Sequence, residues 1–176
     1  MMKPFLKDST KPPLLNISRA VRRKNIPSLI EAYGRSEKLK RKTNLILILG
    51  CRDSPSKLDP QQKDVFNNIF EMIDKYNLYG KVAYPKKHTP ANVPVIYRWA
   101  ASKGGLFVNP ALTEPFGLTL LEASSCGLPI ISTDDGGPKE IHTKCENGVL
   151  VDVTDINKLK VALEKGVSNS FQWKSW

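Results

Sequence analysis

The sequence predicts an α/β domain built on a doubly wound, mainly parallel sheet of about six strands with helices on both faces. Short apolar runs alternate with longer segments in which apolar residues recur at helical spacing, and the connections between them are short. The run 44–50, Asn-Leu-Ile-Leu-Ile-Leu-Gly, has no polar face, as expected for a parallel strand buried on both sides. A length of 176 residues suffices for the core of one ordinary domain and is too short for two.

The expected strands and helices follow one another in strict order. A strand at 14–18 comes after two prolines and precedes a helix at 25–36. The buried strand at 44–50 is followed by a polar loop and a helix at 60–77. Four further pairs complete the series: 81–84 with 93–102, 105–108 with 117–125, 129–133 with 138–142, and 148–152 with 155–167. Six such units indicate a Rossmann-like domain, whose ligands bind at the carboxyl ends of the strands.

The charge of +10 is concentrated near the start of the chain. Residues 1–42 hold 12 Lys and Arg against 3 Asp and Glu, whereas the remainder holds 15 against 14. Several of these cations, at 38–42, cluster at the end of a predicted helix, where they oppose the helix dipole and face solvent. Since no aromatic-rich strand or nucleic-acid motif accompanies them, we expect no nucleic-acid partner.

Composition also bears on the setting of the protein. No apolar run reaches the roughly 18 residues of a membrane span, and residues 1–13 lack the apolar stretch of a signal peptide. We therefore expect a cytoplasmic protein without a membrane partner, in which residues 1–12 form a flexible segment. Cys51, Cys126 and Cys145 are odd in number and widely spaced, which predicts reduced thiols and no zinc site.

The segment 109–122 carries the most chemical information, because it leaves a buried strand, turns and enters a helix. Pro115 and Gly117 mark the turn. The first N–H groups of a helix lack intrahelical partners and lie at its positive end, so this turn suits a diphosphate. If the helix begins near Gly117, Glu122 lies about 7 Å further along its axis, a distance suited to a ribose. Glu114 and Glu122 could thus bind the hydroxyls of two sugars.

Simpler interpretations remain open for these residues. Pro-Phe-Gly fits a plain turn, Glu122 fits an exposed helix position, and Glu114 fits an acidic group near a helix start. A second cluster, Ser-Arg-Ala-Val-Arg-Arg-Lys-Asn at 18–25, follows the first strand and is basic. Fixed cations there could stabilise a departing diphosphate without a metal, although an exposed basic loop would have the same composition.

Taken together, the two clusters resemble the C-terminal domain of the GT-B glycosyltransferases of family four. The signature of that family is a Glu, seven residues and a second Glu, which Glu114 and Glu122 match. Further segments resemble the sucrose-phosphate synthases within it: Ser-Arg with Arg-Lys-Asn at 18–25, 75–85, Asn-Pro-Ala-Leu at 109–112, Glu-Pro-Phe-Gly-Leu-Thr at 114–119, and Gly-Gly-Pro at 136–138. The resemblance covers the chain from about Leu14 to its end.

The resemblance implies a role for each matching residue. Arg19, Lys24 and Glu114 are the implied catalytic residues: the two cations contact the donor diphosphate, and Glu114 holds the transferred glucosyl group. The implied substrate-binding residues are Pro115, Phe116, Gly117, Leu118, Thr119, Glu122, Pro85 and Lys86. Among these, the Leu118 and Thr119 amides meet the phosphates, Glu122 binds the ribose, and the loop of Pro85 borders the uracil. The implied reaction moves glucose from UDP-glucose to fructose 6-phosphate with retention and needs no metal or cofactor.

The resemblance also bears on domain organisation. Residues 13–176 correspond to a nucleotide-sugar-binding domain cut before its last C-terminal helices, and the sugar-phosphate acceptor is bound mainly by an N-terminal GT-B domain that this sequence lacks. We expect the chain to bind UDP-glucose or UDP without turnover, and the surface facing the other domain to be polar. Alternatives are a related family-four enzyme, such as a sucrose synthase or a mannosyl-transferring relative, and a non-catalytic nucleotide-binding partner subunit.

Overall fold

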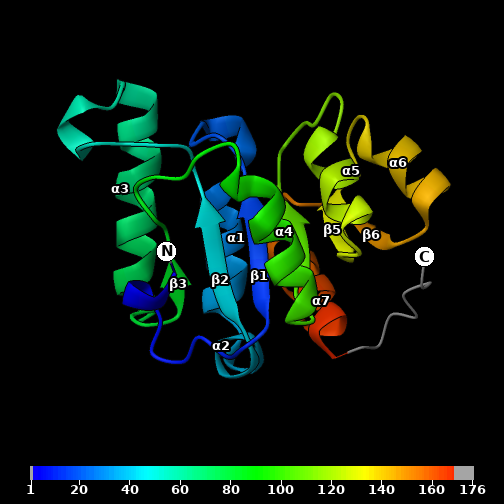
Figure 1. Ribbon diagram of the computed structural model, residues 1–176, viewed down its shortest axis with the longest axis horizontal. Helices are drawn as coiled ribbons and strands as arrows, with labels where there is room; N and C mark the ends of the chain where they lie inside the picture. Colours follow the sequence, from blue (N-terminus) through cyan, green and yellow to red (C-terminus); the bar gives the residue numbers. More distant parts are fainter. Residues whose placement is uncertain (1, 169–176) are drawn as a thin grey trace.

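The computed structural model describes residues 2–168 and shows one six-stranded sheet in which every neighbouring pair of strands is parallel (Figure 1). The strands are β1 (Pro13–Ile17), β2 (Asn44–Ile48), β3 (Val82–Ala83), β4 (Leu106–Asn109), β5 (Ile130–Thr133) and β6 (Gly148–Val151). Their order in the sheet is β3-β2-β1-β4-β5-β6. This is the doubly wound order of a Rossmann-like domain, so the predicted fold class is confirmed.

Helices cover both faces of the sheet (Figure 1). They are α1 (Ile26–Gly34), α2 (Glu37–Lys42), α3 (Pro60–Lys75), α4 (Asn92–Ser102), α5 (Leu118–Ser125), α6 (Pro138–Cys145) and α7 (Ile156–Val167). Buried residues of α1, α2, α3 and α7 form one core with one face of the sheet. Buried residues of α4, α5 and α6 form a second core against the other face. Short 3-10 turns lie at Lys3–Phe5, Arg22–Lys24 and Pro55–Lys57.

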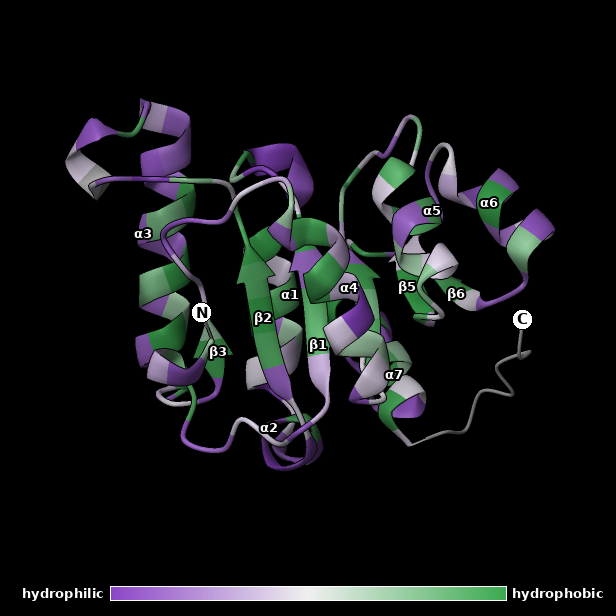
Figure 2. Cartoon of the chain, viewed as in Figure 1, coloured by the Kyte–Doolittle hydropathy of each residue, from purple (hydrophilic) through white to green (hydrophobic). Residues whose placement is uncertain are grey.

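Strand β2 explains why the run at 44–50 has no polar face. Leu45 and Leu47 belong to the first core, whereas Ile46 and Ile48 belong to the second. Successive side chains of a strand point to opposite faces, so a strand covered on both sides must be apolar at every position. The hydrophobic colour of the central strands in Figure 2 follows from this double burial.

The helix predicted at 25–36 is α1 in the structure, and a separate short helix, α2, follows it at 37–42. Helix α1 ends at Gly34, where an added Cβ would lie 2.4 Å from the Tyr76 ring. Ser36 then caps α2 by accepting a hydrogen bond from the Leu39 N–H at 3.2 Å. The basic residues at 40–42 therefore occupy the last turn of α2, where cations are stabilised by the helix carboxyl end. The prediction ended its helix at 36 and assigned no separate helix to residues 37–42.

The amino-terminal segment, for which the sequence predicts flexibility, packs on the domain over residues 2–12. The Phe5 ring lies 5.0 Å from that of Tyr84, and the Lys7 N–H donates to the Gly80 carbonyl at 2.9 Å. The Asn44 amide donates to the Asp8 carbonyl at 2.7 Å. Within the described residues, no helix is long and apolar enough to cross a membrane. Residues 169–176, where the predicted domain was expected to be cut before its last helices, lie outside the described range.

The cap at Ser36 gives a stability prediction. We expect Ser36→Ala to lower the free energy of unfolding by about 1 kcal/mol, because α2 loses a buried N-terminal hydrogen-bond acceptor and Glu164 of α7 loses the hydroxyl that donates to it. Urea unfolding followed by circular dichroism measures this change. The control is Ser102→Ala, whose exposed hydroxyl only donates to the Trp99 carbonyl within α4. Equal losses in the two variants would contradict the capping role.

Candidate functional site

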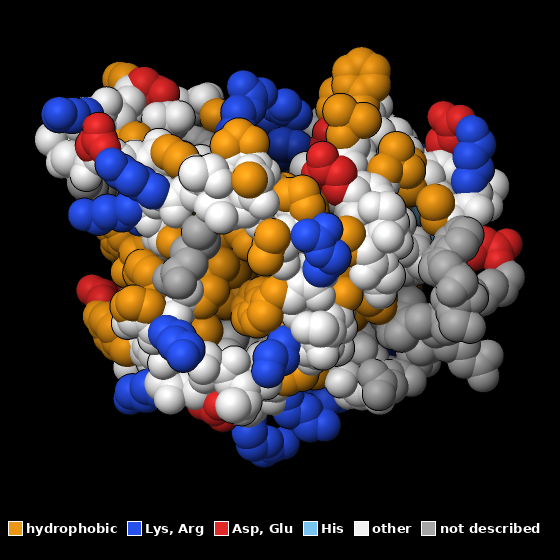
Figure 3. Space-filling view, viewed as in Figure 1, with side chains coloured by type: hydrophobic (Ala, Val, Ile, Leu, Met, Phe, Trp, Pro, Cys, Tyr) orange, Lys and Arg blue, Asp and Glu red, His pale blue; other side chains and the backbone are white. Residues whose placement is uncertain are grey.

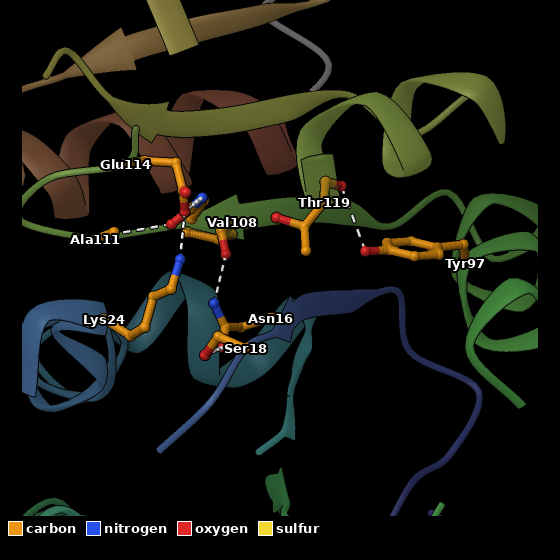
Figure 4. A network of polar contacts seen from close by, with 9 residues as sticks. Asn16, Ser18, Lys24, Tyr97, Val108, Ala111, Glu114 and Thr119 are labelled. Carbon is orange, nitrogen blue, oxygen red and sulfur yellow. Dashed lines mark hydrogen bonds and ion pairs between the residues drawn. The ribbon is translucent and has the colours of Figure 1, made fainter. Parts of the chain in front are cut away.

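The strand order reverses between β1 and β4, and the sheet opens there. Their pairing is confined to Leu14 with Leu106 and Leu15 with Phe107. Beyond these pairs, the buried Asn16 side chain spans the opening and donates to the Val108 carbonyl at 2.9 Å (Figure 4). The opening between neighbouring strands whose connections run in opposite directions is where sheets of this kind bind ligands.

An ion pair joins the loops that follow these two strands. Lys24, which ends a 3-10 turn after β1, donates to the Glu114 carboxylate, which lies in the loop after β4 (Figure 4). Their side chains are only 12% and 10% exposed. The Asn109 amide donates to the same carboxylate oxygen at 2.9 Å, and the Leu112 N–H donates to the Arg23 carbonyl at 2.9 Å. Two residues that the sequence analysis singled out, 90 positions apart in the chain, thus meet at the opening.

The environment of Glu114 favours its ionised form. Burial alone would raise the pKa of this carboxyl group, but hydrogen bonds from Lys24, Asn109 and the Gly117 N–H outweigh it. The net result is a pKa below the ordinary value of 4.5. Glu114 is therefore a fixed negative charge at neutral pH, suited to accept hydrogen bonds from ligand hydroxyl groups.

The loop after β5 supports the loop of Glu114 from the other side. The Gly137 N–H donates to the Glu114 carbonyl at 2.8 Å. A Cβ at Gly136 would lie 2.4 Å from that carbonyl oxygen, and one at Gly137 would lie 2.7 Å from the Pro115 carbonyl. Only glycine permits two backbones to approach this closely. The pair of glycines is thus a structural part of the site, to which the sequence assigned no role.

Helix α5 begins at the turn that the sequence predicted. Gly117 adopts a left-handed conformation with φ of 75°, and its carbonyl accepts the Leu120 N–H at 2.8 Å. Within residues 2–168, the N–H groups of Leu118 and Thr119 donate to no backbone carbonyl. N–H groups without partners at the positive end of a helix are suited to bind an anion.

Glu122, on the second turn of α5, is exposed, and a side chain of the neighbouring helix α4 donates a hydrogen bond to it. The buried Tyr97 of α4 donates its hydroxyl to the Glu122 carboxylate at 3.1 Å, and it lies 3.4 Å from the Thr119 carbonyl. Burial, followed by the charge of Glu122, raises the pKa of Tyr97, so the phenol stays a donor. A hollow of about 530 Å3 adjoins the carboxylate; its lining residues are Val93, Pro94, Tyr97, Arg98, Glu122, Ser125 and Cys126.

The remaining predicted residues lie around the same edge of the sheet. Arg19 is exposed after β1, and within the described residues its side chain has no hydrogen-bond or ion-pair partner. Pro85 is buried and Lys86 is exposed in the loop after β3, and neither is among the side-chain hydrogen-bond partners of Glu114, which are Lys24 and Asn109. The three cysteines are free. No group of three or more His, Cys, Asp or Glu within residues 2–168 could hold a metal ion.

The surface around the site is less polar than expected. Phe116 is 79% exposed and Leu118 is 68% exposed, and Leu112 and Leu121 are each 44% exposed. Figure 3 shows hydrophobic side chains over the loop before α5, beside Lys and Arg side chains. Exposed apolar side chains therefore stand close in sequence to the buried Glu114, and the expectation that the surface facing another domain is polar stays a prediction.

Comparison with known proteins identifies the family. The model of the family described as glycosyl transferases group 1 matches residues 1–174. The chain belongs to this family. It is 44% identical over 169 residues to sucrose-phosphate synthase 1 of Arabidopsis thaliana and 46% identical over 170 residues to sucrose-phosphate synthase of Zea mays. These alignments cover 96% and 97% of the chain but only 16% of each relative, so the group 1 domain is similar to one part of a sucrose-phosphate synthase.

Solved structures of glycosyltransferases share the fold. Sucrose-phosphate synthase from Thermosynechococcus elongatus aligns with 28% identity and a TM-score of 0.74, over 90% of this chain and 37% of that one. HepE of Anabaena, solved in complex with UDP and glucose, aligns with 19% identity and a TM-score of 0.76, over 92% of this chain and 40% of that one. The predicted resemblance to sucrose-phosphate synthases is confirmed.

The lowered pKa of Glu114 gives a prediction about pH. An ionised Glu114 stabilises the fold above the carboxyl group's ordinary pKa of 4.5, and this contribution is lost as the pH falls through its lower folded value. We expect wild type to be more stable than Glu114→Gln at pH 7, with a difference that shrinks on acidification below pH 4.5. Urea unfolding across this range measures it. Glu71→Gln, at an exposed position of α3, is the control; a difference for Glu114→Gln that stays constant with pH would contradict the prediction.

Proposed function

We propose that this domain binds UDP-glucose and forms the donor-binding half of a retaining glycosyltransferase that makes sucrose phosphate from fructose 6-phosphate. The observation that carries the proposal is the buried pair of Lys24 and Glu114 beside the open amino end of α5. A cation, a fixed carboxylate and free backbone N–H groups match a sugar diphosphate, in which phosphate charge lies next to sugar hydroxyl groups.

Each part of the donor has a counterpart in the site. The phosphates lie against the Leu118 and Thr119 amides, with Arg19 and Lys24 supplying positive charge. Glu114, with the backbone of the loop from Pro115 to Gly117, accepts hydrogen bonds from the glucosyl hydroxyls. Glu122 accepts those of the ribose, in the hollow beside Tyr97. The loop of Pro85 and Lys86 borders the uracil ring.

The proposed reaction breaks the bond between C1 of glucose and the β-phosphate oxygen, and UDP leaves with the bonding electrons. A new bond forms between C1 and a hydroxyl oxygen of fructose 6-phosphate, and the hydroxyl proton passes to a phosphate oxygen or to water. Negative charge grows on the diphosphate as the bond breaks. Fixed cations and helix N–H groups stabilise this charge more strongly in the transition state than in the bound donor, which speeds transfer.

Two comparisons support the proposal. The chain is similar to sucrose-phosphate synthases, and a protein of the same fold has been solved with UDP and glucose. Because the chain spans 16% of those relatives, we assign acceptor binding to a separate N-terminal GT-B domain and expect the described domain alone to bind the donor without transferring glucose. The cytoplasmic location expected from the sequence stays a prediction.

Calorimetry with UDP tests donor binding directly. We expect measurable binding to the wild-type chain and an affinity about tenfold lower for Glu122→Ala, because the ribose loses an ionic hydrogen-bond acceptor. Asp134→Ala is the matched control, since Asp134 is an exposed carboxylate after β5 and has no part in the proposed site. Absence of heat at millimolar UDP, or an equal loss in both variants, would refute the assignment.

Arg19 offers a test of the phosphate contacts. Its guanidinium, which has no partner among residues 2–168, is available to a phosphate, so Arg19→Ala should weaken UDP binding about tenfold and leave the weaker binding of uridine unchanged. The affinity of the wild type for UDP should also fall more steeply with added salt than that of Arg19→Ala. Equal losses for UDP and uridine would show that Arg19 does not act on the phosphates.

A further inference from the structure

Arg52 is a buried cation that the proposed donor contacts do not use. It follows β2 and is 7% exposed. Its guanidinium donates to the Tyr84 carbonyl at 2.8 Å and to the Pro85 carbonyl at 3.1 Å, and its backbone N–H donates to the Lys86 carbonyl at 2.9 Å. One residue thus holds three consecutive carbonyl groups of the loop after β3.

Aromatic rings complete the surroundings of this guanidinium. Its carbon lies 4.4 Å from the centre of the Phe66 ring and 5.8 Å from that of Tyr84. Within the part of the chain that the structure describes, no carboxylate forms an ion pair with Arg52. Burial lowers its pKa, which shows that the environment opposes the charge. A planar group that binds two carbonyls and lies against rings provides fixed geometry, which lysine cannot reproduce.

The loop that Arg52 holds leads to the candidate site. It runs from the end of β3 to the start of α4 along the carboxyl edge of the sheet (Figure 1). At the far end of this loop, Val93 and Pro94 in the first turn of α4 line the same hollow as Glu122. The loop at 84–91 therefore leads directly into the helix turn that lines the space beside the proposed ribose contact.

We propose that Arg52 is a positioning residue for the nucleotide base, which it serves by fixing the backbone of Tyr84, Pro85 and Lys86. This inference rests on the proposed function. A loop that distinguishes bases through backbone N–H and C=O groups must hold them within a fraction of an ångström. Arg52 supplies that rigidity through its hydrogen bonds to the loop carbonyls, without touching the ligand.

A second link between the same loops provides a matched control. Lys87 and Asp53 form an ion pair at 3.0 Å, with side chains 72% and 64% exposed. Exposed pairs of this kind contribute little to stability or order. If Arg52 merely joined the two loops, the ion pair of Lys87 and Asp53 would have the same role, and losing either link would have the same effect. If Arg52 instead fixes the carbonyl groups, only substitution of Arg52 changes base recognition.

The test compares affinities for UDP, ADP and inorganic pyrophosphate by calorimetry, using the whole chain. Arg52→Lys keeps the positive charge but loses the planar guanidinium that donates to two carbonyls at once. We therefore expect about tenfold weaker UDP binding and a reduced preference for UDP over ADP. Pyrophosphate binding should stay within about twofold, since its contacts lie at the start of α5. Lys87→Ala should leave all three affinities unchanged. Phe66→Leu, which removes one ring from the guanidinium, should reduce the base preference in the same direction by a smaller factor.

The outcomes separate this inference from the function on which it rests. Wild-type protein that fails to bind UDP overturns the proposed function and this inference with it. Wild-type binding together with an unchanged base preference in Arg52→Lys overturns the role of Arg52 alone. A parallel loss of pyrophosphate would also overturn it, because the substitution would then have disturbed the whole domain. If Arg52→Lys does not fold, an unchanged base preference in Phe66→Leu decides against the proposal.

Discussion

The ion pair between Lys24 and Glu114 is the interaction on which the rest of the site depends. Its two residues lie on different loops, so it forms only if β1 and β4 are neighbours that end at the same edge of the sheet. Burial makes both charges costly unless they are paired and hydrogen-bonded, and Asn109 supplies the further bond. The strand order of the fold is thus what makes this pair of charges tolerable.

The neighbouring loops are built to keep that pair in place. Gly136 and Gly137 let the loop after β5 lie directly on the backbone of Glu114, where any side chain would collide with a carbonyl oxygen. On the other side, the Leu112 N–H binds the Arg23 carbonyl and joins the two charged loops through their backbones. Three strand ends therefore share one set of hydrogen bonds, and a ligand at this edge meets groups whose positions are already fixed.

The sequence predicted the six strands because double burial leaves a strong local mark, the fully apolar run in β2. It singled out Lys24 and Glu114 as candidate site residues because both follow strands and belong to motifs of a known family; the structure pairs them, and their roles stay predictions. It assigned no separate helix to α2, which has only six residues and begins after the Ser36 cap. It gave no sign of Arg52 or Tyr97, since their roles depend on carbonyl and carboxylate partners that are distant in sequence. Local sequence patterns predict helices and strands, whereas contacts between loops distant in sequence are seen only in the folded structure.

The exposed rim of Phe116 and Leu118 has a consequence for how charge acts at this edge. These side chains stand beside the buried pair and the open amino end of α5. A second domain that closes on the rim would bury apolar surface and expel the water that now screens the site. Attraction between a cation and a phosphate grows several-fold as the local dielectric constant falls. The apolar rim would then exclude water from the site, so that the attraction between cation and phosphate reaches its full strength only after the domains close.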